Sequence, residues 1–209
     1  IPRPITHTPE DVFRTNIMAI FNVLEVAATL GISRVVYISS VSVLGLPFSC
    51  APITIEYFPI DEDHPRDPQD AYALSKALGE DIASSFVQRC AGNLSVVSLR
   101  LPWIHTPETF KTQLTPLWDD PAAGATNLWS YIDTRDVGRA CRLSLEAEFS
   151  GHEEVFVSAK DTFMKEDAAN LVKEFYPEAT VRTKLKGNQA LIDTSKAKGL
   201  LGYEANYSW

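Results

Sequence analysis

Apolar residues recur at the spacing of an amphipathic helix between positions 12 and 28, and helix signals stand on both sides. Thr8 can cap the N-terminus, Pro9 suits the first turn, and Gly31 can end the helix. The β-branched run "RVVYISS" follows at 34–40 and is typical of a buried strand. A helix, a tight turn and a buried strand in succession predict an α/β arrangement.

The same alternation continues along the chain. Further strands are expected at 94–101, 128–133 and 154–159, and further helices at 70–90, 134–147, 165–176 and 193–202. Buried parallel strands need helices on both faces, so the pattern predicts a doubly wound, mostly parallel sheet. Two long segments, 46–69 and 103–127, show no regular period, and loops of that length are usually functional.

Composition narrows the class of protein. The 209 residues are 45% hydrophobic and 22% charged, as in ordinary globular proteins. A net charge of -8 argues against binding to nucleic acid or anionic lipid. The sequence contains no run of 18 apolar residues, so no membrane span is predicted. Three widely spaced cysteines favour reduced thiols and a cytoplasmic location. The sequence contains no cluster of histidines and cysteines, so no metal site is predicted.

The stretch "DAYALSKALGE" carries the main chemical candidate, the pair Tyr72 and Lys76. Four residues apart on a helix, the two side chains share one face. Chance supplies roughly 0.3 such pairs in a chain of this composition. Spacing alone therefore fits a half-buried tyrosine beside a surface lysine.

The position of the pair favours a proton-transfer role. The helix at 70–90 follows a loop that begins at the end of the strand carrying Ser40 and Ser42, and ligands bind at strand ends in open α/β sheets. A nearby cation lowers the pKa of a phenol, so Lys76 can tune Tyr72 as an acid or base. Ser40 can hold the substrate oxygen against the tyrosine.

Four motifs in this order resemble the extended short-chain dehydrogenase/reductase family, the group of NAD-dependent epimerases, dehydratases and sugar dehydrogenases. They are "VVYISSVSVLG", "DAYALSK", "SLRLPWI" and "YIDTRDVGRA". In that family a glycine lies five residues after the catalytic hydroxyl, which selects Ser40 by counting back from Gly45. The resemblance implies a Rossmann-like fold, a catalytic set of Ser40, Tyr72 and Lys76, and a structural role for Asn16.

The resemblance also implies binding sites. The cofactor, NAD or NADP, would meet Tyr72 and Lys76 together with Leu101, Pro102 and Trp103. A small-molecule substrate, sugar-like or otherwise polar, would meet Ser42, Trp103 and His105. By the same likeness, residues 1–148 would form the remaining part of the NAD(P)-binding domain, with substrate loops 46–69 and 103–127. Residues 149–209 would form a small substrate-binding region.

Other polar and aromatic residues have plainer explanations. Asp133 and Asp136 fit helix capping and a first helical turn around Thr134. His64, among acidic residues, reads as a solvated loop histidine. Core packing and an aromatic substrate wall are equally good explanations for three tryptophans, Trp103, Trp118 and Trp129.

The family's Gly-rich dinucleotide turn is missing from the sequence. None of the ten glycines forms a Gly-x-x-Gly-x-x-Gly pattern, which lets a pyrophosphate approach a helix N-terminus. We therefore expect an N-terminally truncated form of the fold, either part of a longer enzyme or a shortened relative. The shortened relative would do non-redox acid/base chemistry or serve as a binding or regulatory module. The strand "VVYIS" would lie near an unpaired edge, open to a homodimer or to strand pairing.

The missing turn gives a direct prediction. The 209-residue chain alone should show no tight dinucleotide binding, because a pyrophosphate needs the backbone donors of such a turn. Titration followed by NADH fluorescence measures this, and micromolar affinity would contradict the expectation.

Overall fold

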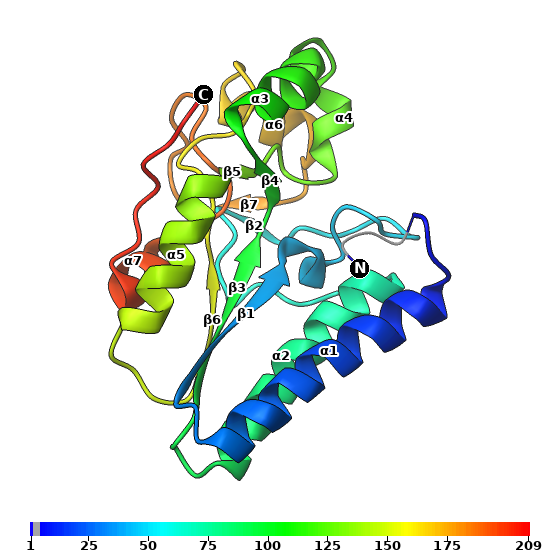
Figure 1. The fold of residues 1–209 in the computed structure, drawn as a ribbon. Helices are drawn as coiled ribbons and strands as arrows, with labels where there is room; N and C mark the ends of the chain where they lie inside the picture. The colour runs from blue at the N-terminus through cyan, green and yellow to red at the C-terminus, as the bar shows by residue number, and fades with distance from the viewer. Residues whose placement is uncertain (2–4) are drawn as a thin grey trace.

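A computed structural model describes residue 1 and residues 5–209, and a parallel sheet lies at its centre. The sheet contains β1 (Arg34–Ser40), β3 (Ser95–Leu101) and β6 (His152–Phe156), in the order β1-β3-β6. Helices α1 (Pro9–Leu30) and α2 (Ala71–Arg89) cover one face; α5 (Thr134–Glu146) and α7 (Ser195–Leu201) cover the other (Figure 1). The α/β, doubly wound prediction is confirmed.

Strand β3 shows why the sheet needs both layers. All seven of its residues are buried, and successive side chains alternate between the faces. Val96 packs in the cluster that holds Leu24 and Phe86 of α1 and α2. Val97 packs in the cluster that holds Ala140 and Leu201 of α5 and α7. An apolar strand of this kind is stable only where helices cover it on both sides.

A lobe of short elements lies beyond the carboxyl ends of the central strands (Figure 1). It contains two parallel strand pairs, β4 (Trp103–His105) with β5 (Tyr131–Asp133) and β2 (Tyr57–Phe58) with β7 (Thr180–Val181). Its helices are α3 (Pro107–Thr109), α4 (Pro121–Ala125) and α6 (Ala168–Phe175). Irregular turns complete it, namely η1 (Val41–Leu44), the π-helical η2 (Phe110–Leu114) and η3 (Thr115–Asp119).

The structure corrects two details of one expected strand and confirms an expected helix cap. The strand expected at 128–133 is shorter, because Leu128 and Trp129 have left-handed backbone angles, φ 61° and 49°. It pairs with β4 and lies outside the central sheet. Asp133 caps α5, as expected, since its carboxylate accepts the Arg135 N–H at 2.8 Å.

The expected division after residue 148 does not follow the sheet. Strand β6 lies beyond that boundary, yet it pairs with β3 over five residues. Helix α7, near the C-terminus, packs against α5 and β6 on the same face. The later part of the chain thus contributes to the central sheet as well as to the lobe.

Strand β1 is an edge strand of the described sheet, and apolar side chains are exposed on it and on α1. Ile38 of β1 is 39% exposed, and Val23, Val26 and Leu30 of α1 are exposed beyond half of their area. By length and composition alone α1 also qualifies as a membrane span, a test that core helices and signal sequences pass too. A homodimer, pairing at this edge and the absence of a membrane partner all stay predictions.

A buried ionic network joins the sheet to α2. The Glu80 side chain is fully buried and accepts hydrogen bonds from Arg100 Nε at 2.9 Å and Arg100 Nη2 at 2.8 Å. It also accepts the Ser39 hydroxyl at 2.7 Å, while Arg66 approaches its other side at 3.4 Å. One carboxylate on α2 therefore binds both β1 and β3.

Removing the Glu80 carboxylate should destabilise the protein strongly. The variant Glu80→Ala leaves the buried Arg100 charge uncompensated, which costs about 3–5 kcal/mol of unfolding free energy. Urea unfolding followed by circular dichroism measures the loss. The control Arg14→Ala breaks an exposed pair with Asp11 and should cost about 1 kcal/mol or less. Equal effects of the two substitutions would contradict the role given to the network.

Candidate active site

One cleft of about 440 Å³ opens where β1 and β3 end and α2 begins. Seven of the eight predicted site residues line it: Ser40, Ser42, Tyr72, Lys76, Leu101, Pro102 and Trp103. They come from separate segments of the chain, and the carboxyl ends of the parallel strands bring them to one edge of the sheet. The structure therefore places the expected catalytic and cofactor-binding residues together.

Ser40 is held at the point where β1 turns into η1. Its hydroxyl caps η1 by accepting the Ser42 N–H at 3.1 Å, and it donates to the Ser42 hydroxyl at 2.9 Å. Gly45 ends this turn with φ 92°, and a Cβ there would lie 2.5 Å from the Asp67 carbonyl oxygen. The turn requires glycine, which gives the serine-to-glycine spacing in the sequence a physical reason.

Tyr72 and Lys76 owe their common face to the start of α2. The Asp70 carboxylate caps the helix by accepting the Tyr72 N–H at 2.7 Å and the Ala73 N–H at 3.1 Å. One turn later, the Lys76 ammonium lies 5.6 Å from the centre of the Tyr72 ring and 5.2 Å from that of Tyr37. It donates a hydrogen bond to the Ile38 carbonyl oxygen at 2.6 Å.

Burial dominates the electrostatics of both groups. Burial raises the pKa of Tyr72; the Ser40 hydroxyl beside it opposes that shift, and the Asp70 charge adds to it. Burial lowers the pKa of Lys76 to about 8, although the Glu80 charge acts in the opposite direction. Lys76 is not among the groups that shift the pKa of Tyr72 in this arrangement, and its ammonium is directed to the Ile38 carbonyl oxygen, so a tuning role for Lys76 stays a prediction.

Asn16 connects α1 to this corner of the cleft. Its amide nitrogen donates to the Ser75 hydroxyl at 3.0 Å, and its oxygen accepts from the amino group of Ile1 at 2.6 Å. Ser75 lies next to Lys76 on α2, so these contacts fix the helix that carries the pair. Asn16 also lines the cleft, in keeping with the structural role that the sequence suggested.

Apolar side chains form the walls. Trp103 lines the cleft and stacks on Phe163, with ring centres 6.3 Å apart and planes 4° from parallel. Trp129 is fully buried in the lobe, and Trp118 packs against Trp209, so neither joins this wall. The loop at 46–69 contributes Pro47 and Phe48, residues that no sequence motif singled out.

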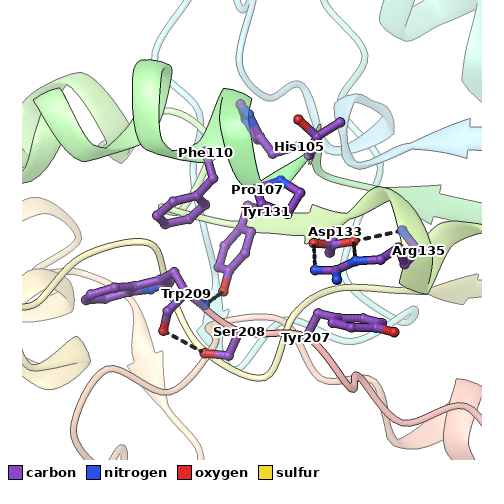
Figure 2. Close-up of a pocket in the computed structure, with 10 residues that line it drawn as sticks. His105, Pro107, Phe110, Tyr131, Asp133, Arg135, Tyr207, Ser208 and Trp209 are labelled. Carbon is purple, nitrogen blue, oxygen red and sulfur yellow. Dashed lines mark hydrogen bonds and ion pairs between the residues drawn. The ribbon is translucent and has the colours of Figure 1, made fainter.

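His105 lies in a different place, a second cavity of about 140 Å³ shown in Figure 2. Asp133 binds Arg135 there through two contacts of 2.8 and 2.7 Å, and the Arg135 guanidinium lies 3.6 Å above the Tyr207 ring centre. Residues 207–209 close this cavity. No described residue from 149–209 lines the first cleft, so a substrate role for that region stays a prediction.

His64 corrects another expectation. It is 3% exposed, and its Nε2 atom accepts the Glu56 N–H at 3.1 Å while the ring packs on Tyr57. The reading as a solvated loop histidine is wrong, because the loop folds back and uses the imidazole to satisfy a backbone donor. Within residue 1 and residues 5–209, no group of three or more histidine, cysteine or acidic side chains is arranged to hold a metal ion.

The sequence also matches a known protein family. The profile of the NAD dependent epimerase/dehydratase family matches residues 6–159, which is most of the chain. The chain belongs to this family. The resemblance drawn from the four motifs is thereby confirmed.

Individual relatives lie within the same family. The chain is 33% identical to uronate dehydrogenase of Pseudomonas putida over 144 residues, covering 63% of this chain and 50% of that protein. It is 25% identical to cinnamoyl-CoA reductase 1 of Petunia hybrida over 189 residues, covering 87% of this chain and 56% of that protein. The chain thus spans about half the length of these relatives.

Solved structures show the same fold. MoeE5 in complex with UDP-glucose and NAD superposes with a TM-score of 0.66 at 21% identity, covering 100% of this chain and 71% of that one. A UDP-galactose 4-epimerase gives a TM-score of 0.64 at 20% identity, covering 99% and 69%. At this level of identity the likeness shows the Rossmann-type fold alone.

The lowered pKa of Lys76 predicts a pH dependence of stability. Its pKa is about 8 in the folded protein against 10.5 for a free lysine, so between these values the unfolded chain binds more protons. The unfolding free energy of the wild type, relative to Lys76→Met, should therefore rise with pH across this window and stay flat below pH 8. Urea unfolding at several pH values measures it. The control Lys160→Met removes a lysine at an exposed position, and the same curve for both variants would contradict the burial of Lys76.

Proposed function

We propose that this chain carries the catalytic half of an NAD(P)-dependent oxidoreductase or epimerase of the extended short-chain type. It would act on a hydroxyl or carbonyl carbon of a sugar-like or other small polar substrate. The observation that carries the proposal is the single cleft lined by Ser40, Tyr72 and Lys76 beside the segment 101–103. Family membership supports it independently.

The residues in the cleft fit the reactive end of a nicotinamide dinucleotide. Lys76 offers a cation beside Tyr72, where a ribose hydroxyl would bind, and Leu101, Pro102 and Trp103 offer a largely apolar wall for a flat ring. When bound, the nicotinamide supplies a hydride acceptor or donor. The 209 residues contain no Gly-rich pyrophosphate turn, so the fit covers this end of the cofactor only.

Tyr72 would move the hydroxyl proton while Ser40 holds the same substrate oxygen. The raised pKa of Tyr72 keeps the phenol protonated near neutral pH, ready to donate to a carbonyl oxygen. The opposite direction needs the phenolate, which a cation stabilises. Lys76 would supply that charge once its ammonium turns from the Ile38 carbonyl, 2.6 Å away, toward the phenol.

Sugar acids and related polyols are the first substrates to test. Two relatives, from Pseudomonas syringae pv. tomato and Pseudomonas putida, are uronate dehydrogenases at 34% and 33% identity. A cleft of about 440 Å³ also lies in the range of small-molecule sites.

The alternative is a dinucleotide-free member of the fold that does non-redox acid/base chemistry or serves as a binding or regulatory module. This alternative requires that the whole protein has no Gly-rich turn, and the 209 residues contain none. A full-length protein that has no such turn and oxidises no alcohol in a broad panel with NAD or NADP would support this alternative over the dehydrogenase.

The variant Tyr72→Phe tests the proposed function. Loss of the phenol hydroxyl removes the proton donor, so turnover of a hexuronate with NAD should fall by a factor on the order of 10²–10⁴. Affinity for NAD should change little, because the ring remains. Steady-state kinetics measures the turnover, and titration with NAD measures the affinity. Both are carried out on the full-length protein.

Tyr207→Phe is the matched control, since Tyr207 lies in the second cavity (Figure 2). It removes the same hydroxyl from a tyrosine outside the cleft and should leave turnover unchanged. Turnover at the wild-type level in Tyr72→Phe would overturn the catalytic assignment.

A further inference from the structure

Asn127 is a polar residue of the cleft that no sequence motif indicated. It follows α4 and precedes β5, and it lines the same cleft as Tyr72 and Lys76. The residue is only 1% exposed, so it lies at the floor of the cleft. Its side-chain oxygen is buried and has no hydrogen-bond partner in the described part of the chain.

The orientation of the Asn127 amide is fixed by its neighbour. The amide nitrogen donates to the Ser130 carbonyl oxygen at 3.2 Å. A carbonyl oxygen only accepts hydrogen bonds, so the nitrogen must face Ser130 and the amide oxygen must face away from it. The unpartnered atom is therefore an acceptor.

The turn that holds Asn127 is strained and well anchored. Leu128 and Trp129, the two residues after it, both have left-handed backbone angles, which side chains other than glycine seldom adopt. The Trp129 ring is fully buried, and its Nε1–H donates to the Pro121 carbonyl at 2.7 Å. Gly124 packs closely against that ring, because a Cβ there would approach the Trp129 Cδ1 atom to 2.4 Å. Such strain persists only where the surroundings determine the conformation.

A buried acceptor without a donor is unfavourable, and native proteins seldom leave one. The cost is recovered when an O–H or N–H group enters the cleft and donates to the oxygen. A neutral acceptor also discriminates between ligand groups. A hydroxyl can donate to it, whereas an ionised carboxylate or phosphate has no proton to donate and is repelled by its partial charge.

We propose that the Asn127 side-chain oxygen accepts a hydrogen bond from a hydroxyl group of a polyhydroxylated substrate held at Tyr72. This inference rests on the proposed function, and it makes Asn127 a specificity-determining residue. The substrate's hydroxyl-bearing side faces Asn127, and its anionic group lies elsewhere. Because the oxygen is buried in this structure, admitting the hydroxyl requires a movement of side chains in the cleft wall.

Two substitutions at Asn127 distinguish the effect of the acceptor oxygen from the effect of the hydrogen bond to Ser130. Both Asn127→Leu and Asn127→Asp remove the amide N–H that donates to Ser130. Asn127→Asp keeps an oxygen acceptor, and burial raises the pKa of such a carboxyl, so at pH 6 a neutral acid can also donate to Ser130. Asn127→Leu offers no acceptor. Thr126→Ala changes the preceding residue, outside the cleft, and is the control.

The probes are D-glucuronate and a set of analogues that each lack one of its hydroxyl groups. Saturation-transfer NMR on the full chain measures their binding without any need for turnover. In the wild type and in Thr126→Ala, one analogue should bind about tenfold more weakly than D-glucuronate, the size of one net hydrogen bond. Asn127→Asp should keep this preference, and Asn127→Leu should lose it for that analogue alone.

The outcomes distinguish this inference from the proposed function. Unchanged discrimination in Asn127→Leu, or no binding of D-glucuronate to the wild type, would overturn the role of Asn127. Discrimination that depends on Asn127, in an enzyme whose Tyr72→Phe variant turns over normally, would support this inference and overturn the proposed function. If Asn127→Leu does not fold, loss of the preference in Asn127→Asp at pH 6 would overturn the proposal by itself.

Discussion

The buried carboxylate of Glu80 is the interaction on which the rest of this structure depends. It binds Arg100 of β3 through two hydrogen bonds and Ser39 of β1 through a third, so α2 cannot slide along the sheet without breaking all of them. Burying one unpaired charge is costly, which makes this register specific. Ser39 precedes Ser40, and Lys76 precedes Glu80 by one helical turn. The network therefore sets the position of the strand end relative to the helix that carries Tyr72.

The same burial that fixes the site also shapes its chemistry. Desolvation raises the pKa of Tyr72 and lowers that of Lys76, so each group favours its neutral form. The Ser40 hydroxyl lowers the pKa of the Tyr72 phenol and so opposes the effect of burial. In this arrangement Tyr72 is a protonated phenol beside a lysine whose pKa is lowered. A modest movement of the Lys76 ammonium from the Ile38 carbonyl toward the phenol would lower the pKa of Tyr72 and favour the phenolate. A site poised in this way suits proton transfer in either direction.

Local patterns predicted the parts of the fold that depend on local physics. The helix at 8–30, the strand at 34–40 and the helix at 70–90 were placed within a residue or two, because caps, periodicity and β-branched runs act over short distances. The lobe was not predicted, since β2 and β7 are two residues long and pair across more than 120 positions. The second cavity around His105 was not predicted, because residues 207–209, which also line it, lie more than 100 positions further along the chain. Asn127 carried no signal at all, as its position depends on a strained turn that only packing around Trp129 makes stable.

The central claim is that Ser40 and Tyr72 meet in one buried site, and the ionisation of the Tyr72 phenol tests it most directly. The ring carbon that bears the hydroxyl can be followed by ¹³C NMR across a pH titration, with Tyr72→Phe used to assign the signal. The structure predicts a pKa above the ordinary tyrosine value of 10, and a still higher value in Ser40→Ala, which loses the hydroxyl that favours the phenolate. A Tyr72 signal that titrates near 10 in both proteins would contradict the account.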